Sequence, residues 1–151
     1  MSGLPEPSVI ERNKQLARRL FTALQDVDTA VIDELISADL VDHSPMFGAN
    51  AFERENLKRA AARFKTAFPD VRIRTEHVLA DGDKVLVHEM VTGTNTGPFG
   101  SAAPTFRGMR VQAAHVLRIA DGQIVEHWSV RELGSMRAAL GIGEDGQPHA
   151  A

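Results

Sequence analysis

The spacing of the apolar residues changes at one proline, and this change limits what the chain can fold into. Before Pro69 the apolar residues recur at helical intervals. After it, apolar and polar residues mostly alternate, as in strands that bury one face. Helices followed by strands that short turns connect are typical of an α+β domain. The sequence therefore predicts helices that cover one face of a curved antiparallel sheet.

Three helices are predicted before the proline. Ser8 begins a Ser-x-x-Glu capping box for the first helix, and Asp28 can cap a shorter second helix. The third helix is expected over about residues 51–68, after Asn50 and stopped by Pro69. The buried stripe expected on the second helix comprises Val31, Ile32, Leu35 and Ile36.

Two Asp-Gly pairs predict tight turns in the second half of the chain. Asp81-Gly82 and Asp121-Gly122 each lie between two alternating segments, as in hairpins. A loop rich in Gly and Pro is expected over 96–104, and a short final helix over 134–140, closed by Gly141. The expected strands are 71–75, 84–94, 106–119 and 123–131.

Length and composition exclude several classes of protein. The 151 residues fit one domain, 1–151, with loose tails at about 1–7 and 143–151. A net charge of −3 argues against nucleic acid or an anionic membrane as the main partner. The chain has no apolar run of transmembrane length and no signal-peptide pattern at its start, which predicts a cytoplasmic protein. The absence of Cys and Tyr removes thiol catalysis, Cys-ligated zinc and phenol donors.

Five segments carry a resemblance to a known family. They are Leu40–Pro45, Ala67–Asp70, Thr92–Gly97, Ile119–Trp128 and Leu133–Gly141. On these residues the chain resembles the SnoaL-like polyketide cyclases, or ester cyclases, of the NTF2-like superfamily. The resemblance implies a cone-shaped barrel, in which a bent antiparallel sheet surrounds a pocket. It also implies three N-terminal helices behind the sheet, a short C-terminal helix, and a homodimer that pairs through the outer face of the sheet.

The same resemblance implies a reaction and exposes one departure from it. Cyclases of this branch close a polyketide ring by intramolecular aldol condensation without a metal or organic cofactor. They use an aspartate directly after the tryptophan as acid/base, with a histidine on the preceding strand nearby. The histidine corresponds to His115, but the aspartate position holds Ser129, directly after Trp128. A serine hydroxyl stays protonated near neutral pH, so it can orient a ligand or donate a hydrogen bond.

Three residues are the predicted catalytic group. Because imidazole titrates near neutral pH, His115 is the preferred base, with Ser129 as its hydrogen-bonding partner and His127 nearby. The alternative interpretation of His115 is a core histidine held by one hydrogen bond. Alternation places one set of side chains of the last strand toward the pocket: Val125, His127, Ser129 and Arg131. The opposite set is Ile124, Glu126, Trp128 and Val130.

A second set is predicted to bind the ligand: His43, His88, Met90, Phe99, Phe106 and Arg131. His88 alternates with Met90 and is expected to line the pocket, so that Glu89 would face the other side. Asp42 could pair with His43 if a bend turned both inward; otherwise it is a loop hydrogen-bonder. No H-x-H or H-x-x-x-H spacing supports a metal site, and none is predicted.

These observations predict a small protein that binds a hydrophobic, polyketide-like carbonyl compound. The predicted activity is cofactor-independent acid/base chemistry, such as intramolecular aldol cyclisation. Two alternatives remain, because the aspartate of the family is missing. One is a ligand-binding module without catalysis, and the other is a hydroxylase-like relative of the cyclases that requires oxygen.

Overall fold

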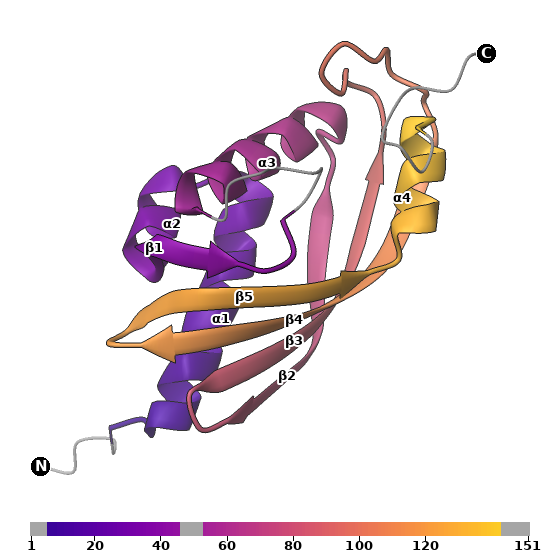
Figure 1. Cartoon of the computed structure of the whole chain (residues 1–151). Helices are drawn as coiled ribbons and strands as arrows, with labels where there is room; N and C mark the ends of the chain where they lie inside the picture. The colour runs from indigo at the N-terminus through magenta and orange to yellow at the C-terminus, as the bar shows by residue number, and fades with distance from the viewer. Residues whose placement is uncertain (1–5, 46–52, 143–151) are drawn as a thin grey trace, which may run out of the picture.

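A computed structural model describes residues 6–45 and 53–142. A single curved sheet runs through it, with strand order β1-β5-β4-β3-β2 and helices against its concave side (Figure 1). The predicted α+β class is confirmed. In chain order the elements are α1 (Val9–Asp26), α2 (Thr29–Leu35), β1 (Ile36–Asp42), α3 (Arg54–Ala67), β2 (Arg72–Asp81), β3 (Lys84–Thr94), β4 (Gly108–Ala120), β5 (Gln123–Arg131) and α4 (Leu133–Leu140).

The predicted helix signals lie where the structure needs them. The Ser8 hydroxyl accepts a hydrogen bond from the Glu11 N–H at 3.2 Å, and Asp28 Oδ1 accepts one from Val31 N–H at 3.2 Å. The helix α3 ends directly before Phe68, its C-cap residue. Asn50, expected before this helix, and both chain ends lie outside the described residues. None of the helices in the described ranges is long and apolar enough to cross a membrane.

Three antiparallel pairings, β2–β3, β3–β4 and β4–β5, make most of the sheet. The second predicted hairpin turn has positive φ at both residues, 52° at Asp121 and 76° at Gly122, which matches the twist of the strands it joins. Along β4, burial alternates strictly from Met109 to Ile119. His115 belongs to the buried set, so it lies on the inner, helix-covered face.

The first strand corrects the prediction of a purely antiparallel sheet. Ile36, expected on the second helix, instead begins β1, which runs parallel to β5 at the edge of the sheet. Its residues pair with partners far along the chain; Ile36 lies beside Ile124 and Asp42 beside His127. Parallel pairing needs a long connection, so no turn signal near residue 36 could reveal it.

A bulge in β5 corrects the predicted faces of its first residues. Glu126 pairs with Arg118, whereas Ile124 pairs with the next residue, Ile119, so Val125 is the additional residue. Ile124 is consequently 1% exposed and belongs to the core, although strict alternation placed it on the other face with Glu126. From His127 to Arg131 the predicted alternation is confirmed.

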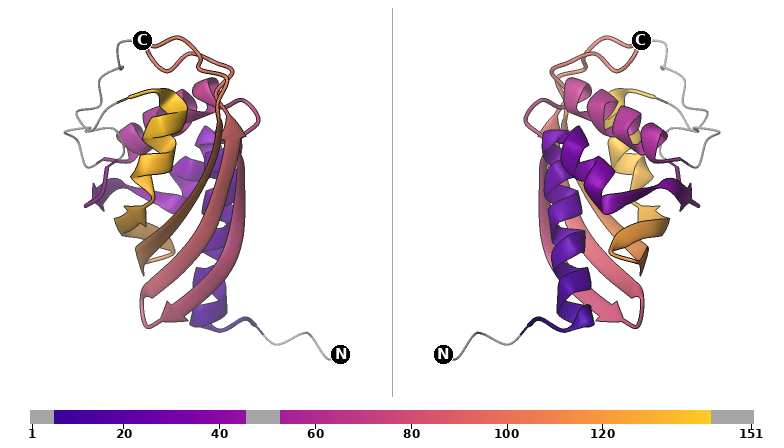
Figure 2. Two further views of the ribbon diagram at one scale, coloured as in Figure 1. Left: turned by 90° about the vertical axis from the view of Figure 1, so that its right-hand side faces the viewer. Right: turned by 90° about the vertical axis from the view of Figure 1, so that its left-hand side faces the viewer.

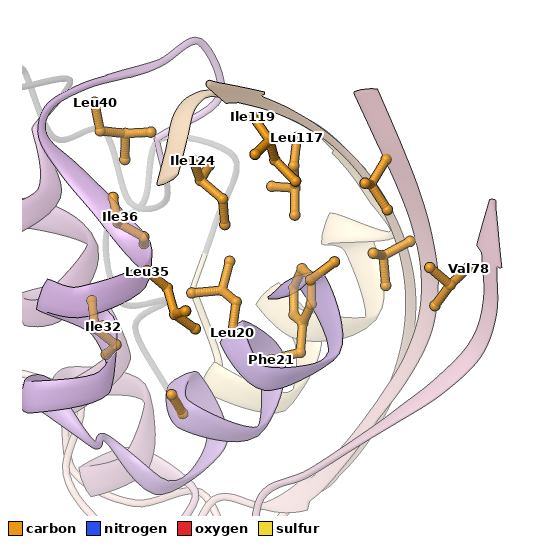
Figure 3. Close-up of a cluster of buried hydrophobic side chains, with 14 residues drawn as sticks. Leu20, Phe21, Ile32, Leu35, Ile36, Leu40, Val78, Leu117, Ile119 and Ile124 are labelled. Carbon is orange, nitrogen blue, oxygen red and sulfur yellow. The ribbon is translucent and has the colours of Figure 1, made fainter. Parts of the chain in front are cut away.

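The core has two parts. Both include side chains of the helices, which lie on the concave side of the sheet (Figure 2). In the first, Leu20 and Phe21 of α1 pack toward Leu117 of β4 and Ile124 of β5 (Figure 3). The second joins Phe68, after α3, to β4 and α4. Side chains from both parts line one cavity.

Candidate active site

The cavity has a volume of about 110 Å³ and lies between α1, α3 and the inner face of β3, β4 and β5. This volume suits a compact molecule better than a drug-sized one, for which sites of about 300–1,000 Å³ are usual. Most of the lining is aliphatic or aromatic. The polar and charged side chains that line it are Gln25, Lys65, Glu89, His115, His127 and Arg131.

Four buried side chains form a continuous chain of hydrogen bonds across the inner face of the sheet. Glu89 Oε1 lies 3.0 Å from His115 Nε2, and His115 Nδ1 lies 2.9 Å from His127 Nε2. His127 Nδ1 lies 2.9 Å from Asp42 Oδ1, which also accepts a hydrogen bond from Ser44 N–H at 2.9 Å. None of the four residues is more than 5% exposed. We call Glu89, His115, His127 and Asp42 the relay.

Strand register brings the relay together. His115 lies on β4, between β3 and β5. Glu89 of β3 pairs with Ala113, which is the inward-facing residue of β4 that precedes His115. On the other side, His127 of β5 pairs with Leu117. Glu89 and His127 are therefore diagonal neighbours of His115, within reach of long side chains. The edge pairing of β1 then places Asp42 directly beside His127.

Burial and neighbouring charges shift the pKa values of this cluster. Burial lowers the pKa of His115 below its ordinary value, and the hydrogen bond to Glu89 opposes this effect. Burial alone would raise the pKa of Asp42. The hydrogen bonds from His127 and Ser44 N–H, with the charge of Arg131, outweigh burial and lower that pKa. Burial also lowers the pKa of Arg131, against the attraction of Asp42 and Glu89.

Glu89 lies on the opposite face of β3 from the one predicted. It lines the cavity instead of facing away from it, and its second oxygen, Oε2, is buried without a hydrogen-bond partner in the structure. Such a buried acceptor is costly unless something else pairs with it. Alternation groups Glu89 with Val87 and Val91 on one face, but it does not show which face of the strand is the inner one.

The prediction for His88 and Met90 was wrong in the same way. Both lie on the outer face of the sheet rather than in the cavity. There His88 Nδ1 lies 3.0 Å from His77 Nδ1, and His88 Nε2 lies 2.9 Å from Gln112 Oε1. The side chains of β3 alternate as predicted, but Glu89 lies on the inner face and His88 and Met90 lie on the outer face.

Ser129 lies opposite His115 in the β4–β5 register and on the same face. Among the described residues, the side chains of Ser129 and His115 do not form the hydrogen bond that was predicted between them. His115 uses both ring nitrogens on Glu89 and His127 instead. The backbone N–H of Ser129 donates to Ser44 Oγ at 3.0 Å, whereas its own Oγ is buried without a partner. Ser129 is not among the residues that line the cavity.

The remaining predicted ligand-binding residues divide into two groups. Arg131 lines the cavity, and its Nη1 donates to Ser44 O at 3.0 Å. Three others lie away from the cavity lining. His43 stacks on Trp128 at 4.7 Å between ring centroids, with its Nε2 3.0 Å from Glu126 Oε2. Phe99 packs against the second part of the core, and Phe106 is 71% exposed. Asp42 therefore turns inward to His127, whereas His43 turns away from the cavity and contacts Trp128.

Metal coordination requires several ligand atoms around one point. In residues 6–45 and 53–142, no group of three or more His, Cys, Asp or Glu side chains is arranged to hold a metal ion. The relay is a line of hydrogen bonds rather than a ring of convergent ligands.

A curved, open sheet with helices on its concave side and a cavity between them defines the class of NTF2-like proteins. The sequence places the chain more closely. The family model described as SnoaL-like polyketide cyclase matches residues 14–140, so the chain belongs to this family. The predicted family is thereby confirmed. A search among curated proteins finds no match.

Solved structures agree with this assignment. The chain is 27% identical to IdmH, a candidate polyketide cyclase from Streptomyces antibioticus, with a TM-score of 0.74 over 86% of this chain and 99% of that one. It is 26% identical to AclR, a candidate hydroxylase from Streptomyces galilaeus, with a TM-score of 0.75 over 87% and 97% of the two chains. A SnoaL-like candidate cyclase from Jannaschia is 22% identical, with a TM-score of 0.78 over 93% and 99%, and supports the fold alone.

Proposed function

We propose that this protein binds a small hydrophobic carbonyl compound in the cavity and catalyses proton transfer at the carbon next to the carbonyl group. Intramolecular aldol cyclisation is the reaction that the family and this chemistry favour. One observation carries the proposal. Glu89, a buried carboxylate on the wall of a mostly apolar cavity, has one oxygen without a hydrogen-bond partner and holds His115 with its other oxygen.

The chemistry needs a base for the acidic C–H and a proton donor for the carbonyl oxygen that is attacked. Glu89 and His115 lie within hydrogen-bonding distance of each other and both line the cavity, so one can hold a proton while the other lacks it. Arg131, on the same wall, can attract the negative charge that develops on the ligand oxygen. Ser129 stays a proposed hydrogen-bond donor: it lies opposite His115 and its Oγ has no partner in the structure, but it could reach a ligand only if its side chain turned toward the cavity.

The test uses acetylacetone, a compact 1,3-dicarbonyl, and the bulkier benzoylacetone. Exchange of the central hydrogen for deuterium is followed by NMR, above the rate in buffer alone. We expect exchange by the wild type and its loss in His115→Ala. His88→Ala is the matched control, because His88 also makes two side-chain hydrogen bonds but lies on the outer face. Equal rates for the wild type and folded His115→Ala would remove His115 from the mechanism.

The second candidate function is ligand binding without catalysis, which the serine at position 129 favours. A ligand that binds the folded state raises the melting temperature whether or not it reacts. Binding of either diketone without exchange at any pH between about 5 and 9 would favour this candidate. A hydroxylase-like activity is the third, suggested by the similarity to AclR. It would be recognised by oxygenated products that form only in the presence of oxygen.

We also propose a cytoplasmic homodimer that pairs through the outer face of the sheet. This face carries the exposed apolar residues Leu79, Leu86 and Val130. Exposed apolar patches of this kind are typical of protein interfaces. Sedimentation should give a dimer for the wild type and a monomer for Val130→Lys. The control Val9→Lys changes an exposed valine of α1 and should remain dimeric. A monomeric wild type would contradict the proposal.

A further inference from the structure

The relay contains three hydrogen bonds in series, and each of them requires a proton between its two atoms. Two neutral imidazoles supply two protons, and two ionised carboxylates supply none. With only two protons for three hydrogen bonds, one of the three contacts would place two lone pairs against each other. The short separation between the two imidazoles, 2.9 Å, is a hydrogen bond only if one ring donates to the other. The complete relay therefore holds a third proton.

The Asp42 end determines where the third proton resides. Asp42 Oδ1 accepts from Ser44 N–H at 2.9 Å, and an ionised carboxylate is the form best suited to accept a second bond from His127 Nδ1–H. A neutral His127 with its proton on Nδ1 has a lone pair on Nε2, which can accept only from His115 Nδ1–H. The remaining nitrogen of His115, Nε2, then shares the third proton with Glu89 Oε1.

We infer that Asp42 and His127 are positioning residues that fix the tautomer of His115 and so keep one transferable proton between His115 and Glu89. This inference rests on the proposed function, since it assigns the acid/base group of that site. It assigns the acid/base group to His115 and to Glu89 of β3, and not to Ser129.

The proposed step balances without a further reactant. The C–H bond of the ligand breaks, and its proton bonds to Glu89 Oε2. The proton on Glu89 Oε1 passes to His115 Nε2, and the electron pair of the C–H bond stays on the ligand as an enolate. Glu89 remains neutral throughout, while His115 becomes an imidazolium with both N–H groups already paired. Ring closure and reprotonation return the proton by the same route.

Other elements supply few charges near this proton. Arg131 of β5 attracts Asp42 and Glu89 and disfavours a charged His115. From the helices, α3 contributes Lys65 and α1 contributes the uncharged Gln25 to the cavity wall. Among the described residues, Arg131 and Lys65 are therefore the cations that line the cavity together with Glu89 and His115.

The first test reads the tautomers directly in the ligand-free protein. Long-range proton–nitrogen NMR on histidine labelled with ¹⁵N distinguishes a protonated from an unprotonated ring nitrogen. We expect His127 to be protonated at Nδ1 and unprotonated at Nε2, and His115 to be protonated at Nδ1. A neutral His127 with its proton on Nε2 would overturn the inference.

The second test reads their effect on catalysis. In Asp42→Asn and His127→Leu, kcat for diketone exchange should fall at least about tenfold, the lower end for loss of acid/base assistance, with a shifted pH profile and little change in KM. His127→Gln should retain more activity than His127→Leu, because its amide can accept from His115 and donate to Asp42. Glu126→Gln, on the outer face, is the control. Equal activity of His127→Gln and His127→Leu would refute a positioning role.

The two tests separate this inference from the proposed function. Expected tautomers together with no exchange by the wild type would support the proton arrangement and reject the acid/base activity. Exchange by the wild type together with an Nε2-protonated His127 would support the activity and reject the arrangement.

Discussion

Glutamine at position 89 is the sharpest single test of the cavity chemistry. Glu89→Gln keeps the size of the side chain and leaves an acceptor oxygen for His115, but it removes the ionisable group that would take the proton. A mechanism that depends on Glu89 as acid/base must therefore fail, while the fold should persist.

The structure sets the expected magnitudes. General acid/base assistance contributes about 10²–10⁴-fold to a rate, or about 2.7–5.5 kcal/mol of barrier, and the variant should lose an effect of this size. The bond between His115 and Glu89 changes from one that can involve a charge, worth about 1.5–3 kcal/mol, to a neutral one of about 0.5–1.5 kcal/mol. A neutral amide also costs less to bury than a carboxylate, so the free energy of unfolding should change by about 1 kcal/mol or less.

Deuterium exchange of acetylacetone gives the rate, and urea unfolding gives the stability. Glu126→Gln is the matched control, since Glu126 also contacts a histidine, His43, but on the outer face. It should keep the wild-type exchange rate. A folded Glu89→Gln protein that exchanges within twofold of the wild type would refute the reasoning. A loss of several kcal/mol in stability would instead assign Glu89 a structural role.

Three other changes have defined outcomes. Ser129→Asp restores the residue of the family opposite His115 and should add cyclisation of polyketide-like diketones; no gain would indicate that the cavity itself has diverged. Because the pKa of Asp42 is lowered in the folded state, its stabilising effect should be complete above its ordinary pKa of about 4 and be lost as pH falls further. Urea titrations should thus show the gap between wild type and Asp42→Asn narrowing from pH 6 to pH 3; a constant gap would contradict this. In Gly97→Ala the new Cβ would lie 1.8 Å from Thr66 O, so we expect a destabilisation above about 3 kcal/mol in the same assay, and near-wild-type stability would show that this loop can move.

Local signals predicted the features that depend on local chemistry. Ser8 and Asp28 cap their helices because a side-chain oxygen can reach a backbone N–H three residues ahead. Asp121-Gly122 forms its turn because both residues adopt positive φ readily. The pairing of His115 with Ser129 needs the bulge at Val125 as well, because the register of the turn alone would place Trp128 opposite His115.

Local signals do not show which face of β3 is the inner one. Alternation divides its residues into two faces, but Val87 and Val91 accompany Glu89 on one face while Leu86 and Met90 accompany His88 on the other. Both faces are similarly apolar, because the outer face also carries apolar side chains. The position of Asp42 depends on a parallel pairing between distant segments, and this has no local signature.

The geometry around His115 gives the departure at position 129 a physical interpretation. His115 lies on a strand with neighbours on both sides, and a carboxylate at position 129 would approach it from β5, directly across the pair. In this chain the carboxylate that contacts His115 comes from β3, on a diagonal, while β5 contributes the second imidazole, His127. An acidic side chain at 129 would add a third carboxylate close to Glu89 and Asp42, with Arg131 as the buried cation beside them. Ser129 thus leaves Glu89 as the carboxylate that contacts His115, and Ser129→Asp tests whether a further acid on β5 adds the cyclisation of the family.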